Sequence, residues 1–131
     1  MIEYYGWVNI LDDVCESDST KLHKIVEEIR HIIEEIRFDY RILELKWMNG
    51  NCILCTAGSS NHRTKDVVDI IKLFETISTK AQGAYGLLYI FDDEDDGGTS
   101  DEFKVFRIAK GKVSIEKDHL LSPCNATIFE D

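Results

Sequence analysis

The sequence contains little that would divide it into domains or direct it into a membrane. It has one proline, Pro123, and eight scattered glycines, so no linker is apparent. No apolar run approaches the roughly 20 residues that cross a bilayer, and the N-terminus has neither the basic region nor the cleavage site of a signal peptide. With 131 residues, of which 44% are hydrophobic, the chain is long enough to form one domain with its own core. We therefore expect a single domain over residues 1–131, located in the cytoplasm.

Basic residues are also scarce, both in total and in particular segments. Fifteen Lys and Arg residues against 25 Asp and Glu residues give a net charge of −10. This balance argues against direct nucleic-acid binding, because neutralising phosphates needs clustered cations. Residues 1–20 contain five acids, residues 81–103 contain seven and residues 118–131 contain three, and none of these segments contains Lys or Arg. The acidic residues are thus concentrated in these three segments, and we predict an acidic C-terminal tail over residues 119–131.

Hydrophobic periodicity predicts two amphipathic helices and six strands. Apolar residues spaced three or four apart predict helices over residues 18–37 and 64–80, and Asp18 or Ser19 is placed to cap the first of them. Asn49-Gly50 and Lys110-Gly111 predict the turns of two β-hairpins. Alternating or continuous apolar residues predict strands over residues 2–11, 41–48, 52–56, 84–91, 103–108 and 113–115.

The order of these elements predicts the fold class. Strand, helix, strand, strand, helix, strand is the order of a ferredoxin-like split β-α-β arrangement, here extended by a C-terminal β-hairpin. Right-handed crossovers place both helices on one face of a mainly antiparallel sheet. We therefore predict a two-layer α+β domain.

Two of the four cysteines have a spacing that occurs in metal and redox sites. Cys52-Ile-Leu-Cys55 has no second pair of ligands at a fitting distance. On a strand, an offset of three directs the two sulfurs to opposite faces. We interpret both as buried structural cysteines. Cys15 and Cys124 are isolated in the sequence, and a chain without evident disulfide pairs is typical of a reducing compartment.

The histidines and the one small glycine–serine segment give weak signals. His23, Glu27 and His31 share a face of the first helix, which we interpret as a solvated face rather than a metal site. Residues 58–60, Gly-Ser-Ser, precede the second helix and could bind an anion at its N-terminus, but no phosphate-loop lysine follows. We expect no metal, no cofactor and no enzymatic activity.

Residues 92–102 are the most acidic stretch of the chain. The beginning of this stretch resembles a calcium loop, but the twelfth position is Phe103 instead of a bidentate Glu, and strands flank it instead of helices. Two interpretations remain open, a solvated hairpin loop and an acidic docking surface for a basic partner. The topology places this loop and the tail at one pole of the sheet, and Asp12, Asp13, Glu16 and Asp18 at the other. The candidate partner-binding carboxylates are Asp92, Asp93, Glu94, Asp95, Asp96, Asp101 and Glu102.

Aromatic residues provide the second candidate for a partner interface. Tyr5 and Trp7 share one face of the first strand, and Tyr85 and Tyr89 share one face of the fourth. If that face is not covered by helices, these side chains are available as binding hot spots. The alternative is that they belong to the core. We include Tyr5 and Trp7 among the candidate partner-binding residues.

Several segments together resemble one known family. They are Tyr5-Gly6-Trp7, the strand of residues 85–89 followed by Asp-Asp-Glu at 92–94, and the ending from residues 121–124 to 130–131. In this order they resemble the Immunity protein 7 family of bacterial polymorphic-toxin and contact-dependent inhibition systems. The resemblance implies a small cytosolic protein that binds and neutralises a cognate toxin domain, often a nuclease.

The residues and the resemblance lead to one main hypothesis of function. We expect a non-enzymatic immunity protein whose acidic surface covers the basic cleft of a nuclease-like toxin C-terminal domain, and a homo-oligomer is possible. The alternative is a small-molecule-binding ferredoxin-like regulatory module with its ligand between sheet and helices. A small enzyme that uses Cys55 or His62 ranks last, because neither residue has an evident base or oxyanion site beside it.

Overall fold

The structure, a computed structural model, describes residues 1–12, 19–37, 40–61, 65–95 and 97–130. None of the helices in these parts of the chain is both long and apolar enough to cross a membrane. The elements are β1 (Ile2–Ile10), α1 (Ser19–Ile36), β2 (Arg41–Met48), β3 (Asn51–Ser60), α2 (Lys65–Lys80), β4 (Tyr85–Asp92), β5 (Phe103–Ala109), β6 (Lys112–Lys117) and η1 (Asn125–Phe129), a π-helical turn. The predicted α-helices and strands are all present. Asp18, one of the two proposed cap residues, lies outside the described residues.

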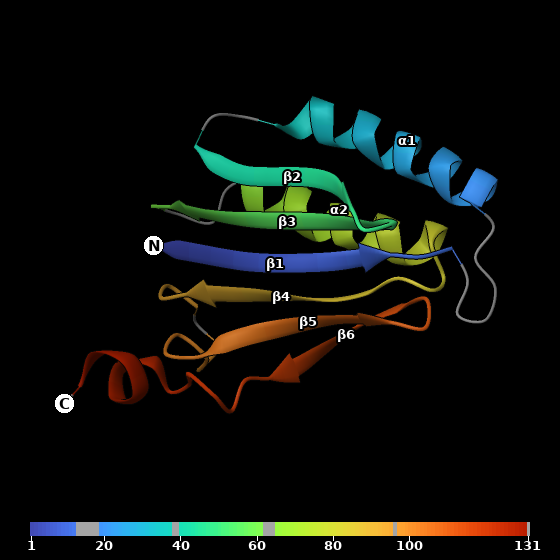
Figure 1. The fold of residues 1–131 in the computed structure, drawn as a ribbon. Coiled ribbons are helices and arrows are strands. Elements are labelled where there is room, and N and C mark those ends of the chain that lie inside the picture. The colour runs from blue at the N-terminus through green and yellow to red at the C-terminus, as the bar shows by residue number, and fades with distance from the viewer. Residues whose placement is uncertain (13–18, 38–39, 62–64, 96, 131) are drawn as a thin grey trace.

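The described strands form one six-stranded sheet in the order β2-β3-β1-β4-β5-β6. Every neighbouring pair is antiparallel. The sheet and its two α-helices confirm the α+β class. Figure 1 shows β1 in the middle of the sheet, α2 behind the sheet near β3, and α1 along the β2 side. It also shows that the C-terminal turn lies at the end of the sheet where β1 begins and β4 ends.

The two predicted hairpin turns have the backbone that their sequences favour. Asn49 and Gly50 have φ angles of 53° and 82°, and Lys110 and Gly111 have 55° and 73°. Two successive positive φ angles define a type I′ turn, whose twist matches that of paired strands. The turns therefore fix the registers Met48↔Asn51 and Ala109↔Lys112.

The larger of two buried clusters lies between the helices and one face of the sheet. On β1 the even-numbered residues Ile2, Tyr4, Val8 and Ile10 are at most 1% exposed. They belong to one cluster that also contains residues from both α-helices, such as Ile29 and Phe74. Gly6 interrupts the row because a Cβ there would lie 2.8 Å from the Phe74 ring. We call this side of the sheet the covered face and the opposite side the open face.

Arg41 joins both α-helices to the first residue of β2. Its guanidinium group donates to the carbonyl oxygen of Ile36, the last residue of α1, and at 3.0 Å to that of Asp66 in the first turn of α2. The side chain is buried. The bond to Ile36 satisfies a carbonyl group that has no partner within the last turn of α1, and the two bonds together link both α-helices to β2.

The structure places residues 58–60, considered above as a possible anion site, within a strand. Gly58 and its two neighbours lie in β3, which runs four residues beyond the predicted end. The ring of Tyr4 covers Gly58, and a Cβ on Gly58 would lie 2.2 Å from the Tyr4 hydroxyl oxygen. The glycine therefore makes room for a core side chain, and the strand continues through it.

Candidate partner-binding surface

The open face of the sheet carries three exposed aromatic side chains side by side. Tyr5, Trp7 and Tyr85 are 45%, 41% and 45% exposed. The Trp7 and Tyr85 rings meet edge to face with centroids 6.0 Å apart, and the Asn9 amide donates to the Tyr85 hydroxyl at 2.9 Å. We call these three residues the aromatic ridge. They are not core residues, whereas Tyr89 on the same face is half-buried against Phe103.

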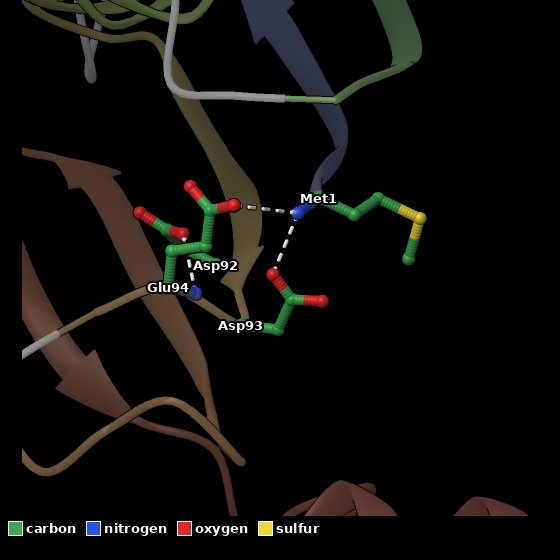
Figure 2. A network of polar contacts seen from close by, with 4 residues as sticks. All are labelled: Met1, Asp92, Asp93 and Glu94. Carbon is green, nitrogen blue, oxygen red and sulfur yellow. Dashed lines mark hydrogen bonds and ion pairs between the residues drawn. The ribbon is translucent and has the colours of Figure 1, made fainter.

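The first residues of the acidic loop, as we call residues 92–102, contact the N-terminal amino group. The Met1 ammonium lies 2.6 Å from Asp93 Oδ1 and 3.8 Å from Glu94 Oε1, as Figure 2 shows. In the same turn, Asp92 Oδ1 accepts a hydrogen bond from the Glu94 N–H at 3.0 Å. The Asp93 carboxylate raises the pKa of the amino group by this hydrogen bond and by its charge. Part of the negative charge of the loop is thus balanced within the protein.

Asp95 organises the interior of the loop. Its carboxylate accepts hydrogen bonds from the Thr99 hydroxyl at 2.6 Å and the Gly97 N–H at 2.8 Å, and it pairs with Lys104 Nζ at 3.0 Å. These three contacts, the Thr99 bond foremost, hold the pKa of Asp95 well below its ordinary value. Among the described residues, no cluster of three or more acidic, His or Cys side chains is arranged to hold a metal ion. Asp96, another candidate residue, lies outside the described residues.

Asp101 joins the acidic loop to the C-terminal tail. Its carboxylate accepts from the Asn125 N–H at 2.7 Å, and its carbonyl oxygen accepts from the Cys124 N–H at 2.7 Å. The predicted approach of the tail to this pole is confirmed. Asp93, Asp95 and Asp101 thus have partners within the protein, and Glu94 lies beside the Met1 ammonium. Glu94 is exposed and Glu102 is half-buried.

The tail folds back onto the open face and leaves a hollow of about 320 Å³. Its apolar lining is formed by Phe91, Phe103, Leu121, Cys124, Ile128 and Phe129. Glu3 and Tyr5 complete the lining, and the Tyr5 hydroxyl donates to Glu3 Oε2 at 2.6 Å. We call this feature the tail hollow. Sequence reasoning missed it, although the apolar residues among the acids of the tail are a signal that could have indicated packing.

A network of hydrogen bonds holds the tail in this position. The Asp118 carboxylate accepts from the backbone N–H groups of Leu120 and Leu121 at 3.0 and 3.1 Å and from the Ser122 hydroxyl at 2.9 Å. The Ser122 hydroxyl oxygen accepts in turn from the Phe103 N–H at 2.8 Å. The end of β6, the tail and the beginning of β5 are therefore coupled.

The cysteines and histidines form no chemical site in the described parts of the chain. Cys52 is buried on the covered face, but Cys55 is exposed on the open face, so the prediction that both are buried is wrong for Cys55. The opposite orientation of the two side chains follows the strand period. On α1, Glu27 and His31 are exposed, while the exposed His23 ring stacks on Trp47 with centroids 4.6 Å apart. His62 and Cys15 lie outside the described residues.

The comparisons with known proteins agree with the resemblance of the separate segments. The model of the family described as Immunity protein 7 matches residues 1–130. Neither the curated proteins nor the solved structures contain a match to the chain. Because the family model spans the strands, both α-helices, the acidic loop and the tail, the chain belongs to the Immunity protein 7 family.

Proposed function

We propose that this protein binds a cognate toxin domain and neutralises it by occupying its surface, without catalysing a reaction. Membership of the Immunity protein 7 family is the observation that carries this proposal. The surface geometry supports it, because the aromatic ridge and the acidic loop offer binding groups. We place this activity in the cytoplasm, where a toxin that enters the cell would meet its target.

The acidic loop and the aromatic ridge are the proposed contact region. Loop residues 92–102 lie at the pole where β1 begins, because Ile2 pairs with Asp92, and Tyr5 stands near that pole on the open face. Nucleases bind a polyanion and therefore have basic clefts, so a basic, nuclease-like toxin is the partner that this surface would attract. Opposite potentials raise association rates toward about 10⁸ M⁻¹s⁻¹ at low salt, and Trp and Tyr side chains supply much of the energy at hot spots.

The sheet topology supports the predicted split β-α-β arrangement. In the order β2-β3-β1-β4, β1 lies between two antiparallel neighbours, and the strands that follow the two helices occupy opposite sides of it. We propose that the first four strands and the two α-helices form a ferredoxin-like unit. The β5–β6 hairpin then widens the open face on the side where the tail returns.

The proposal is tested by capture of the toxin C-terminal domain encoded beside this protein. A one-to-one complex that weakens with salt supports an acidic interface. A complex whose affinity does not change with salt would support the immunity function but argue against an acidic interface. No complex at low or high salt rejects the function.

Charge reversal locates the contact. We expect Glu94→Lys combined with Glu102→Lys to weaken the complex, because both residues are at the surface of the acidic loop. The matched control is Glu34→Lys combined with Glu35→Lys, which changes the net charge equally on the exposed side of α1. Equal affinities of the two double variants would show that only net charge matters.

A further inference from the structure

The tail hollow combines an apolar lining with one carboxylate, that of Glu3. Glu3 has no basic partner among the described residues, and no described residue donates a hydrogen bond to its Oε1 atom. None of the described residues that line the hollow is basic. The carboxylate thus faces a hydrophobic space, and the described residues leave one of its oxygens available.

The electrostatic environment of the hollow favours a cation. Burial raises the pKa of the Cys124 thiol at its wall, and the carboxylates of Asp101, Asp118 and Glu3 raise it further although the Ser122 hydroxyl opposes them. The same negative potential would stabilise a positive charge beside Glu3. The Tyr5 hydroxyl stays protonated, since its hydrogen bond to Glu3, burial and the charge of Glu3 raise its pKa to about 12.

The size and shape of the hollow point to a side chain rather than to a large ligand. Its volume of about 320 Å³ is at the lower end of the range of ligand sites, about 300–1,000 Å³. Part of its wall is accessible from solvent, because Phe129 is 67% exposed and Ile128 is 45% exposed. A long side chain with an apolar stem and a charged end fits such a space, since the stem packs against apolar groups while the end finds an acceptor.

We propose that the tail hollow receives an arginine side chain of the partner protein, with the guanidinium group at Glu3 and the methylene groups against Phe103 and Phe129. Arginine fits better than lysine because its guanidinium group is more weakly hydrated and pairs with a carboxylate through two N–H groups. The aromatic rings beside Glu3 add cation–π attraction. This inference rests on the proposed function, because it assigns one contact of the toxin.

The first test measures affinity for the toxin domain by calorimetry. Glu3→Gln keeps the shape and can still accept the Tyr5 hydrogen bond, but it removes the charge. We expect a loss of roughly 10- to 100-fold, the range for a hydrogen bond to a charged group. Glu44→Gln is the matched control, since Glu44 is an exposed residue of β2 on the same face, and we expect its affinity to be unchanged.

The second test needs no toxin. N-acetylarginine amide is titrated into the protein while the ring signals of Tyr5, Phe103 and Phe129 are followed by NMR, and the neutral citrulline analogue is the control. We expect the arginine compound alone to shift these signals, and the shifts to be absent in Glu3→Gln.

The two tests separate the two proposals. If the wild-type protein binds the toxin and Glu3→Gln binds equally well, the arginine contact is wrong and the immunity function stands. If the toxin does not bind at all, the proposed function fails, and the titration still decides whether the hollow accepts arginine. Equal shifts with the citrulline analogue, or unchanged shifts in Glu3→Gln, would overturn the inference.

Discussion

The two faces of the sheet use the same kinds of residue for different purposes. Tyr4 and Tyr5 are neighbours on β1, yet Tyr4 is 1% exposed and Tyr5 is 45% exposed. Tyr4 points to the covered face, where its ring lies over Gly58, and Tyr5 points to the open face, where its hydroxyl binds Glu3. Because side chains alternate along a strand, one β-strand supplies both the core and the candidate binding surface. The covered face should therefore supply most of the stability, and the part of the open face that the tail leaves uncovered should determine binding.

The largest test of this comparison is the adjacent tyrosine pair. Tyr4→Ala removes a fully buried ring, and we expect a loss of about 3–5 kcal/mol in the free energy of unfolding, as for other large aromatic residues in cores. Tyr5→Ala should cost less, about 1–2 kcal/mol, because nearly half of the side chain is already in water. Urea unfolding of both variants measures the difference. Similar losses would show that Tyr5 contributes to the core as Tyr4 does.

Release of the tail should cause the next largest loss of stability, because the tail covers only part of the open face. Asp118→Ala removes the acceptor of three hydrogen bonds, and we expect a loss of about 1–3 kcal/mol. The loss should be local to the tail. Hydrogen exchange should become faster at the N–H groups of Leu120 and Leu121 and remain slow in β1. Equal acceleration in β1 would mean that the tail is needed for the whole fold.

Local sequence was sufficient to predict the elements whose structure is determined locally. The α-helices begin and end within one residue of the predicted bounds, because their apolar periodicity continues to the ends. Asn49-Gly50 predicted its hairpin because both residues tolerate positive φ. The strand β3 was predicted too short, because glycine is typical of loops. Gly58 lies in the strand because the Tyr4 ring of the neighbouring strand occupies the space of a side chain there.

The candidate site was harder to predict, because it depends on contacts between distant segments. The strand period placed Tyr5 and Trp7 on one face, but it could not decide which face the helices cover. The loop carboxylates were predicted to form either a solvated loop or an acidic docking surface. In the structure, Asp95 holds the loop together and Asp101 holds the tail. The tail itself has no helical or strand period. Its position follows from Asp118, Ser122 and the rings of β4 and β5.

The smallest expected effect is the pH dependence of tail docking. Burial opposes the charge on Asp118, but hydrogen bonds from the Leu120 N–H, the Ser122 hydroxyl and the Leu121 N–H outweigh it, and the charge of His119 adds to them, so the pKa lies below its ordinary value. A carboxyl group with a lowered pKa contributes stability above the pKa of the unfolded state, about 3.9 for Asp, and that contribution is lost as the pH falls through the folded-state pKa. Protonation keeps the side chain in place, so the effect is smaller than that of Asp118→Ala.

The matched control for this pH dependence is Asp118→Asn, which has the same shape and no titration. The difference in unfolding free energy between wild type and Asp118→Asn should be constant at neutral pH and should shrink below about pH 4. Asp95 also has a lowered pKa, but it titrates in both proteins and cancels in the difference. Urea unfolding at several pH values from neutral to acid gives the profile. A difference that stays constant into strong acid would show that the charge on Asp118 does not hold the tail. The tail would then be held by the packing of its own apolar residues against Phe91 and Phe103.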